Sequence, residues 1–352
     1  MPEGHSVHRI ARQFARNFVG HRVAASSPQG RFAEGASLID GRTMTASRAV
    51  GKQMFLEFDH ELWLRVHLGM YGAWDFAGDI TTDATIRSAS GRMGQTNQRG
   101  TVLGAQAEGS EAEIAVAGES AAAAASGVSL DDADGEDSVQ SIGAPRRARL
   151  RMAEQEKVGD DYATFPPEPV GQVRVRLLTE TAVADLRGPT ACEVLSPEQV
   201  AAVIGKLGPD PLVDDTPEAE DDFVAAVTKK PTPIGLLLMD QSVVSGIGNV
   251  YRAELLFRAR LNPHTPGKLV PADTVRAIWR DWTYLLGLGV RTGQMMTMDG
   301  LDDPAYAKAM ANRADRHWVY KREGLPCRIC GTNIVMEEMG GRKLYWCPVD
   351  QA

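Results

Sequence analysis

The sequence predicts an α+β protein of two domains, in which a β-sandwich with one helix at its N-terminus precedes a helical domain that ends in a short β-type segment. Apolar residues recur at helical spacing near the N-terminus, alternate with polar residues in later stretches, and return to helical spacing after residue 223. The chain has 352 residues, of which 43% are hydrophobic, and this is enough to bury a core in each of two domains.

The first predicted element is an amphipathic helix close to the N-terminus. Its apolar face is formed by residues at helical spacing, and Gly20 is placed to end it: Val7, Ile10, Ala11, Phe14 and Phe18. The helix begins a few residues after Pro2, and its apolar face must pack on the rest of the domain. We therefore expect the N-terminus to be held against the folded body.

Three later stretches are typical of β-strands and predict the sandwich. They read QMFLEFD (53–59), LWLRVHLGMYGAWDF (62–76) and QVRVRLLTETAVADL (172–186). In the last stretch Val173, Val175 and Leu177 alternate with arginines, which is the period-two pattern of a strand with one buried face.

The range 78–167 separates these strands and has the composition of a disordered insertion. It is rich in Ala, Gly, Ser and acidic residues and poor in aromatic residues. A segment of this composition buries too little apolar surface to offset the entropy that is lost when it orders.

The net charge of −8 is concentrated in that insertion. Positions 101–140 hold nine acidic residues and no Lys or Arg, and without those nine the chain has 38 basic and 37 acidic residues. From Lys229 onward the chain has 17 basic and 12 acidic residues, so its charge is compatible with a nucleic-acid partner.

There is no run of about 18 apolar residues and no basic-then-apolar leader, so we expect a cytoplasmic protein without a membrane partner.

A Pro- and acid-rich linker is predicted at 207–222, and a helical domain follows it. The turn SVVSGIG leads into the helix NVYRAELLFRARL, for which Asn249 is a suitable N-cap. Gly246 and Gly248 lie just before that helix, where free backbone N–H groups suit a phosphate. A helical hairpin with a purely structural turn explains the same pattern.

Three of the four cysteines lie near the C-terminus at spacings that suit a metal. The pattern Cys327-x2-Cys330-x16-Cys347-x2-Asp350 matches a zinc ribbon at three positions, whereas the fourth position holds a carboxylate. Carboxylate oxygen binds Zn²⁺, so we expect structural zinc on Cys327, Cys330, Cys347 and Asp350. A metal-free hairpin held by its own packing is the alternative.

Several motifs occur in the order in which the formamidopyrimidine-DNA glycosylase/endonuclease VIII family has them, and the chain therefore resembles that family. They are Pro2-Glu3-Gly4, GKQMFLEF, HLGMYG, ADLRGPTACEVL, LGPDPL, LLMDQSVVSGIGNVYRAELLFRARLNP, HWVYKREGLPCRICG and GRKLYWCP. The resemblance covers the chain apart from the insertion. Within the family the chain is most similar to the endonuclease VIII branch, particularly its actinobacterial members.

The resemblance implies four regions. They are an N-terminal catalytic β-sandwich domain at 1–206, a linker at 207–222, a helix–two-turn–helix DNA-binding domain at 223–315, and a zinc-finger-like β-hairpin at 316–352.

The resemblance also implies a bifunctional DNA glycosylase and AP lyase of base excision repair. Pro2 is the nucleophile once Met1 is removed, because an α-amino group has a pKa of about 8 and is partly uncharged near neutral pH. Glu3 is the general acid and base, and Lys52 contacts the phosphate next to the lesion. The iminium formed on Pro2 promotes β,δ-elimination of the two phosphates.

The same resemblance assigns the contacts to double-stranded DNA with damaged bases or abasic sites, bound by a monomer. Asn249 and Arg342 clamp the flanking phosphates, and Met70 and Tyr71 fill the space left by the flipped base. The stretch LRGPTA lacks the Phe that the formamidopyrimidine branch inserts. We therefore expect oxidised pyrimidines as substrates.

Two alternatives remain open at this point. The first is the same chemistry with 8-oxoguanine or formamidopyrimidine as the main substrate, and the second is a non-catalytic protein that binds damaged DNA. Two positions depart from the family pattern: Ser6 stands where a second glutamate is common, and Asp350 stands where the fourth cysteine is expected.

Overall fold

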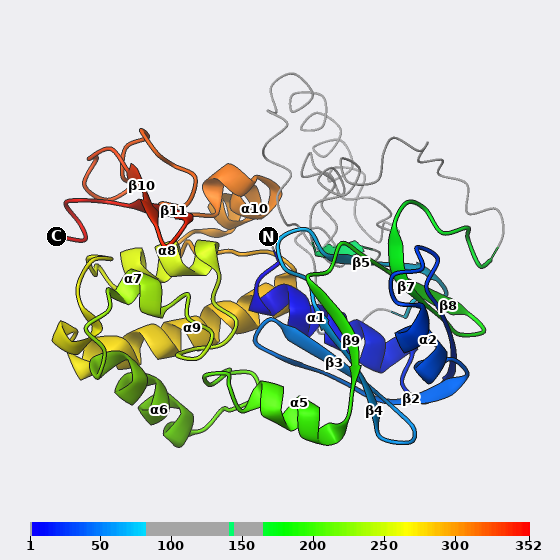
Figure 1. Ribbon diagram of the computed structural model, residues 1–352. Coiled ribbons are helices and arrows are strands. Elements are labelled where there is room, and N and C mark those ends of the chain that lie inside the picture. Colours follow the sequence, from blue (N-terminus) through cyan, green and yellow to red (C-terminus); the bar gives the residue numbers. More distant parts are fainter. Residues whose placement is uncertain (1, 82–140, 144–164) are drawn as a thin grey trace, which may run out of the picture. The chain divides into compact units, whose positions relative to one another are not determined.

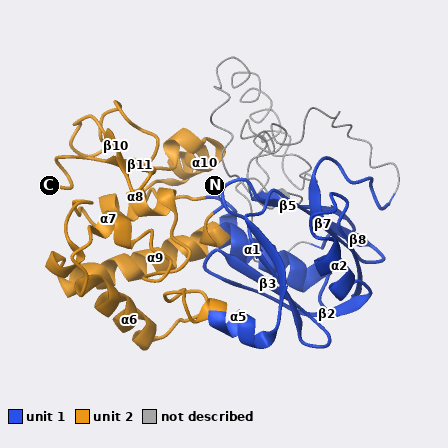
Figure 2. Ribbon diagram, viewed as in Figure 1, with its two compact units in different colours: residues 1–2, 6–202, 290–294 blue, residues 3–5, 203–289, 295–352 orange. Residues whose placement is uncertain are grey.

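The computed structural model describes residues 2–81, 141–143 and 165–352, and most of the predicted insertion lies outside these ranges (Figure 1). The described chain divides into two compact units (Figure 2). Unit 1 comprises residues 1–2, 6–202 and 290–294, and unit 2 comprises residues 3–5, 203–289 and 295–352. Three residues at the N-terminus thus belong to the second unit.

Unit 1 is an antiparallel β-domain. The described strands are β1 (Arg22–Ser26), β2 (Arg42–Val50), β3 (Gln53–Phe58), β4 (Leu62–His67), β5 (Ala73–Gly78), β6 (Ser141–Gly143), β7 (Val173–Leu178), β8 (Ala182–Arg187) and β9 (Ala191–Leu195). Their hydrogen-bonded order is β6-β5-β8-β7-β1-β2-β3-β4-β9. Inward-facing residues from both ends of this order join one core, as a sandwich requires.

Within the described ranges, three helices accompany these strands: α1 (Gly4–Asn17), α2 (Ala33–Ile39) and α5 (Pro197–Ile204). The predicted N-terminal helix is confirmed, and its apolar stripe is buried as expected. Phe14 packs edge-on against Trp74 with ring centroids 4.8 Å apart, and it also contacts Phe18 and Phe76. Burying one such ring stabilises the fold by about 2–3 kcal/mol.

Two strand predictions need correction in detail. The stretch 172–186 forms two paired strands, β7 and β8, and the buried ion pair between Arg176 and Asp185 joins them, with N–O distances of 2.7 and 2.8 Å. The predicted insertion also contains β6, which pairs with β5 because Ile142 enters the core with 2% of its surface exposed.

Unit 2 combines helices with one β-hairpin. Its main elements are α6 (Pro217–Thr228), α7 (Ile234–Leu237), α8 (Asn249–Arg258), α9 (Ala272–Thr292, of which the last residues belong to unit 1), α10 (Asp303–Ala311), β10 (Val335–Met339) and β11 (Arg342–Trp346). β10 pairs antiparallel with β11, and α8 packs against β11. The predicted fold class, a β-domain followed by a helical domain with a terminal hairpin, is confirmed.

Helix boundaries in unit 2 differ from the sequence prediction at two places. The range 207–222 includes the start of α6, where the Thr216 side chain accepts a hydrogen bond from Ala219 N and Pro217 occupies the first turn. The prediction that Asn249 caps α8 is wrong, because Gly248 is the N-cap and Asn249 is already helical. The Asn249 side chain is therefore available for contacts outside the helix.

No helix within the described ranges is long and apolar enough to cross a membrane.

Candidate functional site

Glu3 is fully buried at the N-terminus of α8. Its Oε2 accepts hydrogen bonds from Gly248 N at 2.9 Å and Tyr251 N at 3.4 Å, and its Oε1 accepts one from Val250 N at 2.9 Å. These donors are among the N–H groups that an α-helix leaves unpaired at its start, and the positive end of the helix dipole favours a negative charge there. The carboxylate is thereby held in one orientation, directly after Pro2 in the chain.

The prediction that the turn 245–248 suits a phosphate needs correction. Gly248 N and the helical Val250 N already bind the Glu3 carboxylate, and Gly246 N donates to Gln241 Oε1 at 3.1 Å. Gly246 has a φ of 92°, and its carbonyl accepts a hydrogen bond from Gly4 N at 2.9 Å. The anion recognised by this turn is therefore a side chain of the same molecule.

Close backbone approach at Gly248 gives a testable prediction. A Cβ atom at this position would lie 2.3 Å from Glu3 Cδ, which no ordinary contact permits. Gly248→Ala is therefore expected to lower the free energy of unfolding by about 1–3 kcal/mol, as overpacking of a core does. Urea unfolding of the variant measures this loss.

The matched control is the same change in a Glu3→Ala background. In that background the colliding carboxyl group is absent, so adding Gly248→Ala should lower the free energy of unfolding by almost nothing further. An equal loss in both backgrounds would place the strain elsewhere.

Asn249 lies at the first position of α8 and joins the helix to the hairpin. Its Nδ2 donates to Lys343 O at 2.8 Å, and its Oδ1 accepts a hydrogen bond from Arg252 Nη2 at 2.5 Å. Arg342 is the residue next to Lys343, at the start of β11, and is half-buried. Unit 2 thus brings three predicted site residues, Glu3, Asn249 and Arg342, to one end of α8.

Arg252 is a buried residue that the sequence analysis missed. Its guanidinium also donates to the carbonyl groups of Gly235 and Met339, at 3.4 and 3.3 Å. Burial lowers the pKa of Arg252 to about 10, whereas nearby Glu3 raises it. The only signal in the sequence is a cation inside an apolar helical stretch.

The other predicted site residues lie in unit 1. Pro2 is buried at the start of the described chain. Lys52 is half-buried in the tight turn between β2 and β3, after Gly51 with a φ of 58°. Burial lowers the pKa of His67, and the charges of Lys52 and Arg65 lower it further. His67 is the last residue of β4 and pairs with Gln53, the residue after Lys52.

Met70 and Tyr71 occupy the turn between β4 and β5 and are exposed by 42% and 49%, which excludes a place in the core. The turn is held by Thr190 N donating to His67 O at 2.9 Å and by Gly72 N donating to Leu68 O at 2.9 Å. Two consecutive large apolar side chains are thus presented on a well-anchored turn.

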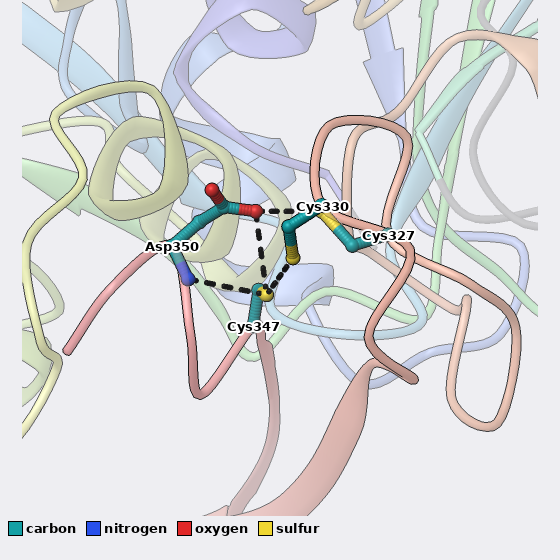
Figure 3. A group of neighbouring side chains, drawn as sticks. All are labelled: Cys327, Cys330, Cys347 and Asp350. Atoms are coloured by element: carbon teal, nitrogen blue, oxygen red, sulfur yellow. Dashed lines mark hydrogen bonds between the residues drawn. The ribbon is translucent and has the colours of Figure 1, made fainter.

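Cys327, Cys330, Cys347 and Asp350 come together as predicted (Figure 3). Their ligand atoms all lie within 4.8 Å of one another, and Sγ of Cys330 and Cys347 are 3.5 Å apart. Four ligands at Zn–S distances of about 2.3 Å in a tetrahedron have edges of about 3.8 Å, so this set fits zinc.

A second buried network in unit 2 was also missed. Glu254 on α8 accepts hydrogen bonds from the N–H groups of Trp318, Val319 and Tyr320 at 2.8–2.9 Å and from the Thr297 hydroxyl at 2.5 Å. Burial raises the pKa of Glu254, while these hydrogen bonds lower it. Glu254 thus anchors the segment that leads into the cysteine-bearing hairpin.

His317 lies in the same segment and predicts a dependence of stability on pH. Its burial lowers its pKa well below 6.5, and Arg313, Arg316, Arg328 and Lys321 lower it further. In the unfolded chain it binds a proton below about pH 6.5, whereas the folded chain excludes that proton. The contribution of neutral His317 to the free energy of unfolding is therefore fully present above pH 6.5 and is lost as the pH drops below 6.5.

Replacing His317 by Gln is expected to flatten the loss of stability between pH 7 and pH 5, as followed by thermal melts. His21, which is exposed, serves as the control position with His21→Gln. Identical pH profiles for the parent and His317→Gln would contradict this prediction.

Comparison with known protein families gives three matches along the chain. The formamidopyrimidine-DNA glycosylase N-terminal domain matches residues 1–103, and the formamidopyrimidine-DNA glycosylase H2TH domain matches residues 207–299. The zinc finger found in FPG and IleRS matches residues 324–352. A zinc-finger domain therefore contains the cysteine cluster, in agreement with the predicted cofactor.

Among curated proteins, Endonuclease 8 1 of Mycobacterium tuberculosis (strain ATCC 25618 / H37Rv) is 33% identical over 351 residues, which is 100% of both chains. A formamidopyrimidine-DNA glycosylase of Thermus thermophilus is 34% identical over 149 residues, which is 42% of this chain and 54% of that protein. The full-length match confirms the resemblance that the motifs indicate.

Solved structures show the same fold. A complex of wild-type Lactococcus lactis Fpg (MutM) with DNA containing N7-benzyl-Fapy-dG superposes with a TM-score of 0.63 at 18% identity, over 99% of both chains. The MutM (Fpg) protein of Thermus thermophilus gives a TM-score of 0.59 at 20% identity, over 99% of this chain and 98% of that one.

Proposed function

Because this chain belongs to the formamidopyrimidine-DNA glycosylase/endonuclease VIII family, we propose that it removes oxidised pyrimidines from DNA and nicks the strand by β,δ-elimination through a Schiff base on Pro2. Its class, a DNA glycosylase and AP lyase of base excision repair, is that of the family, as the sequence predicted. The observation that carries the proposal is the Glu3 carboxylate held by three N–H groups beside Pro2.

The proposed reaction begins with the secondary amine of Pro2, exposed by removal of Met1. Its lone pair attacks the sugar C1′, the bond to the base breaks, and the base leaves with a proton. The C1′–O4′ bond then breaks as O4′ takes up a proton, and the resulting iminium withdraws electrons from C2′, so that a C2′ proton is lost and the 3′-phosphate departs. A second elimination expels the 5′-phosphate.

We assign Glu3 the proton transfers to and from the opened sugar. A general acid or base acts only from a fixed position, and the hydrogen bonds at α8 supply that position. Lys52, half-buried in its turn, is assigned the phosphate next to the lesion.

Asn249 and Arg342 are proposed to hold the flanking phosphates. The hydrogen bond from Asn249 to Lys343 O links the start of α8 to β11, so one rigid element orients both residues. We propose Cys327, Cys330, Cys347 and Asp350 as zinc ligands; zinc would fix the end of β11, five residues after Arg342. The metal would act structurally in this arrangement.

Met70 and Tyr71 support the choice of lesion. Their exposure on an anchored turn suits insertion into the base stack after the damaged base is flipped out. The partner we propose is double-stranded DNA with damaged bases or abasic sites, bound by a monomer in the cytoplasm.

The test is a panel of duplexes that carry thymine glycol, dihydrouracil, 8-oxoguanine or an abasic site, cleaved by untagged, Met-processed protein. Faster excision of the two pyrimidines than of 8-oxoguanine is expected. A preference for 8-oxoguanine would favour the formamidopyrimidine type of specificity, and binding without cleavage of any substrate would favour a non-catalytic role.

A further inference from the structure

Arg260 has an unusual backbone conformation just after Ala259, the C-cap of α8. Its φ is 49°, in the left-handed region that glycine adopts without strain and that a side chain with a Cβ atom adopts at a cost. Helices commonly place glycine at this point. Any residue with a Cβ atom strains the backbone at this position, so the contacts of the arginine side chain must be considered.

The Arg260 guanidinium contacts the cysteine cluster through Asp350. Its Nη1 lies 3.4 Å from Asp350 Oδ1, while the other carboxylate oxygen, Oδ2, lies 3.0 Å from Cys327 Sγ and 3.5 Å from Cys347 Sγ. The Arg260 side chain is 61% exposed and that of Asp350 only 7%. The two carboxylate oxygens thus have different partners: one faces the sulfur atoms and the other faces the arginine.

The next residue, Leu261, is also linked to the cysteine cluster, through Gln351. Leu261 O accepts a hydrogen bond from Gln351 Nε2 at 3.0 Å, and Gln351 Oε1 accepts one from Cys347 N at 2.9 Å. Gln351 is fully buried. Arg260 therefore contacts the side chain of Asp350, and Leu261 is linked to the backbone of Cys347 through Gln351.

A carboxylate needs such a partner more than a cysteine does. A thiolate offers one donor atom, whereas a carboxylate offers two oxygens and can bind a metal through either or both. Hydrogen bonds to the outer oxygen orient ligating carboxylates, and loss of outer partners typically lowers metal affinity by about 10–100-fold.

We propose that Arg260 is the outer partner that orients Asp350 as the fourth, oxygen, ligand of the zinc site, so that the Arg260–Asp350 pair takes the place of a fourth cysteine. This inference rests on the ligand set proposed above.

The test measures zinc affinity of the full-length protein by competition with a chromogenic chelator, and thermal stability of the zinc-free protein. Arg260→Gly is expected to lower zinc affinity about 10-fold or more. The same change should leave the zinc-free protein as stable as the parent or more stable, because glycine relieves the left-handed conformation. Lys321→Gly is the matched control, since Lys321 also has a positive φ, 57°, and is not a member of the cluster.

A second background separates orientation of the ligand from general support of the fold. In Asp350→Cys, the thiolate needs no outer partner, so adding Arg260→Gly should leave zinc affinity unchanged. Equal losses in both backgrounds, or affinity within twofold of the parent in Arg260→Gly alone, would overturn the inference. Parental zinc affinity in Asp350→Ala would instead refute the ligand set.

Discussion

Protein that keeps an uncleaved N-terminal extension is expected to lose strand cleavage and borohydride trapping by at least about 1,000-fold, which corresponds to about 4 kcal/mol of transition-state stabilisation. In the extended chain the Pro2 nitrogen is part of an amide, and its lone pair is delocalised into the carbonyl group. It therefore cannot form an iminium with the sugar. Burst experiments on abasic duplexes measure the loss.

DNA binding is the internal control for this prediction. The proposed phosphate contacts of Lys52, Asn249 and Arg342 do not involve the terminal amine, so the extended protein should bind abasic duplexes with nearly parental affinity in a gel-shift assay. Proteolytic removal of the extension back to Pro2 should restore cleavage. Full cleavage by the extended protein would show that another nucleophile acts.

Replacing Glu3 by Gln should have the second-largest effect, and it should affect both rate and stability. The amide keeps one acceptor oxygen but turns an NH₂ group toward backbone N–H donors of α8. We expect the free energy of unfolding to fall by about 1–3 kcal/mol. Base excision should slow by about 100-fold or more, because the proton-transfer group is lost.

Glu254→Gln is the matched control for that double effect. Glu254 is also buried on unit 2, and it also accepts three backbone N–H bonds, but these lie in the segment Trp318–Tyr320. This variant should lose comparable stability and keep its excision rate at temperatures where it is folded. If Glu3→Gln kept a parental rate in spite of its lower stability, Glu3 would be a structural residue only.

Local patterns were sufficient to predict much of the fold. The apolar stripe from Val7 to Phe18 predicts α1 because a helix needs nothing more than its own periodicity and a core to pack on. The spacing of Cys327, Cys330 and Cys347 predicts the cluster for a similar reason: short loops bring paired ligands together. β6 could not be predicted, since three residues carry no period.

The details of the site depend on contacts between distant positions, and these could not be predicted. Gly248 and Val250 donate to a carboxylate about 245 positions away in the chain, so the free N–H groups that the turn suggested for a phosphate bind Glu3. Likewise, Asn249 is a good capping residue by type, but Lys343 O and Arg252 determine where its side chain lies.

The position of the covalent bond to DNA distinguishes a Schiff base on Pro2 from one on a lysine. Untagged protein is trapped with borohydride on a duplex containing an oxidised pyrimidine, digested with trypsin and nuclease, and analysed by mass spectrometry. We expect the reduced sugar on the N-terminal peptide, at the nitrogen of Pro2. A sugar adduct on Lys52 or on any other lysine, with the N-terminal peptide unmodified, would contradict this expectation.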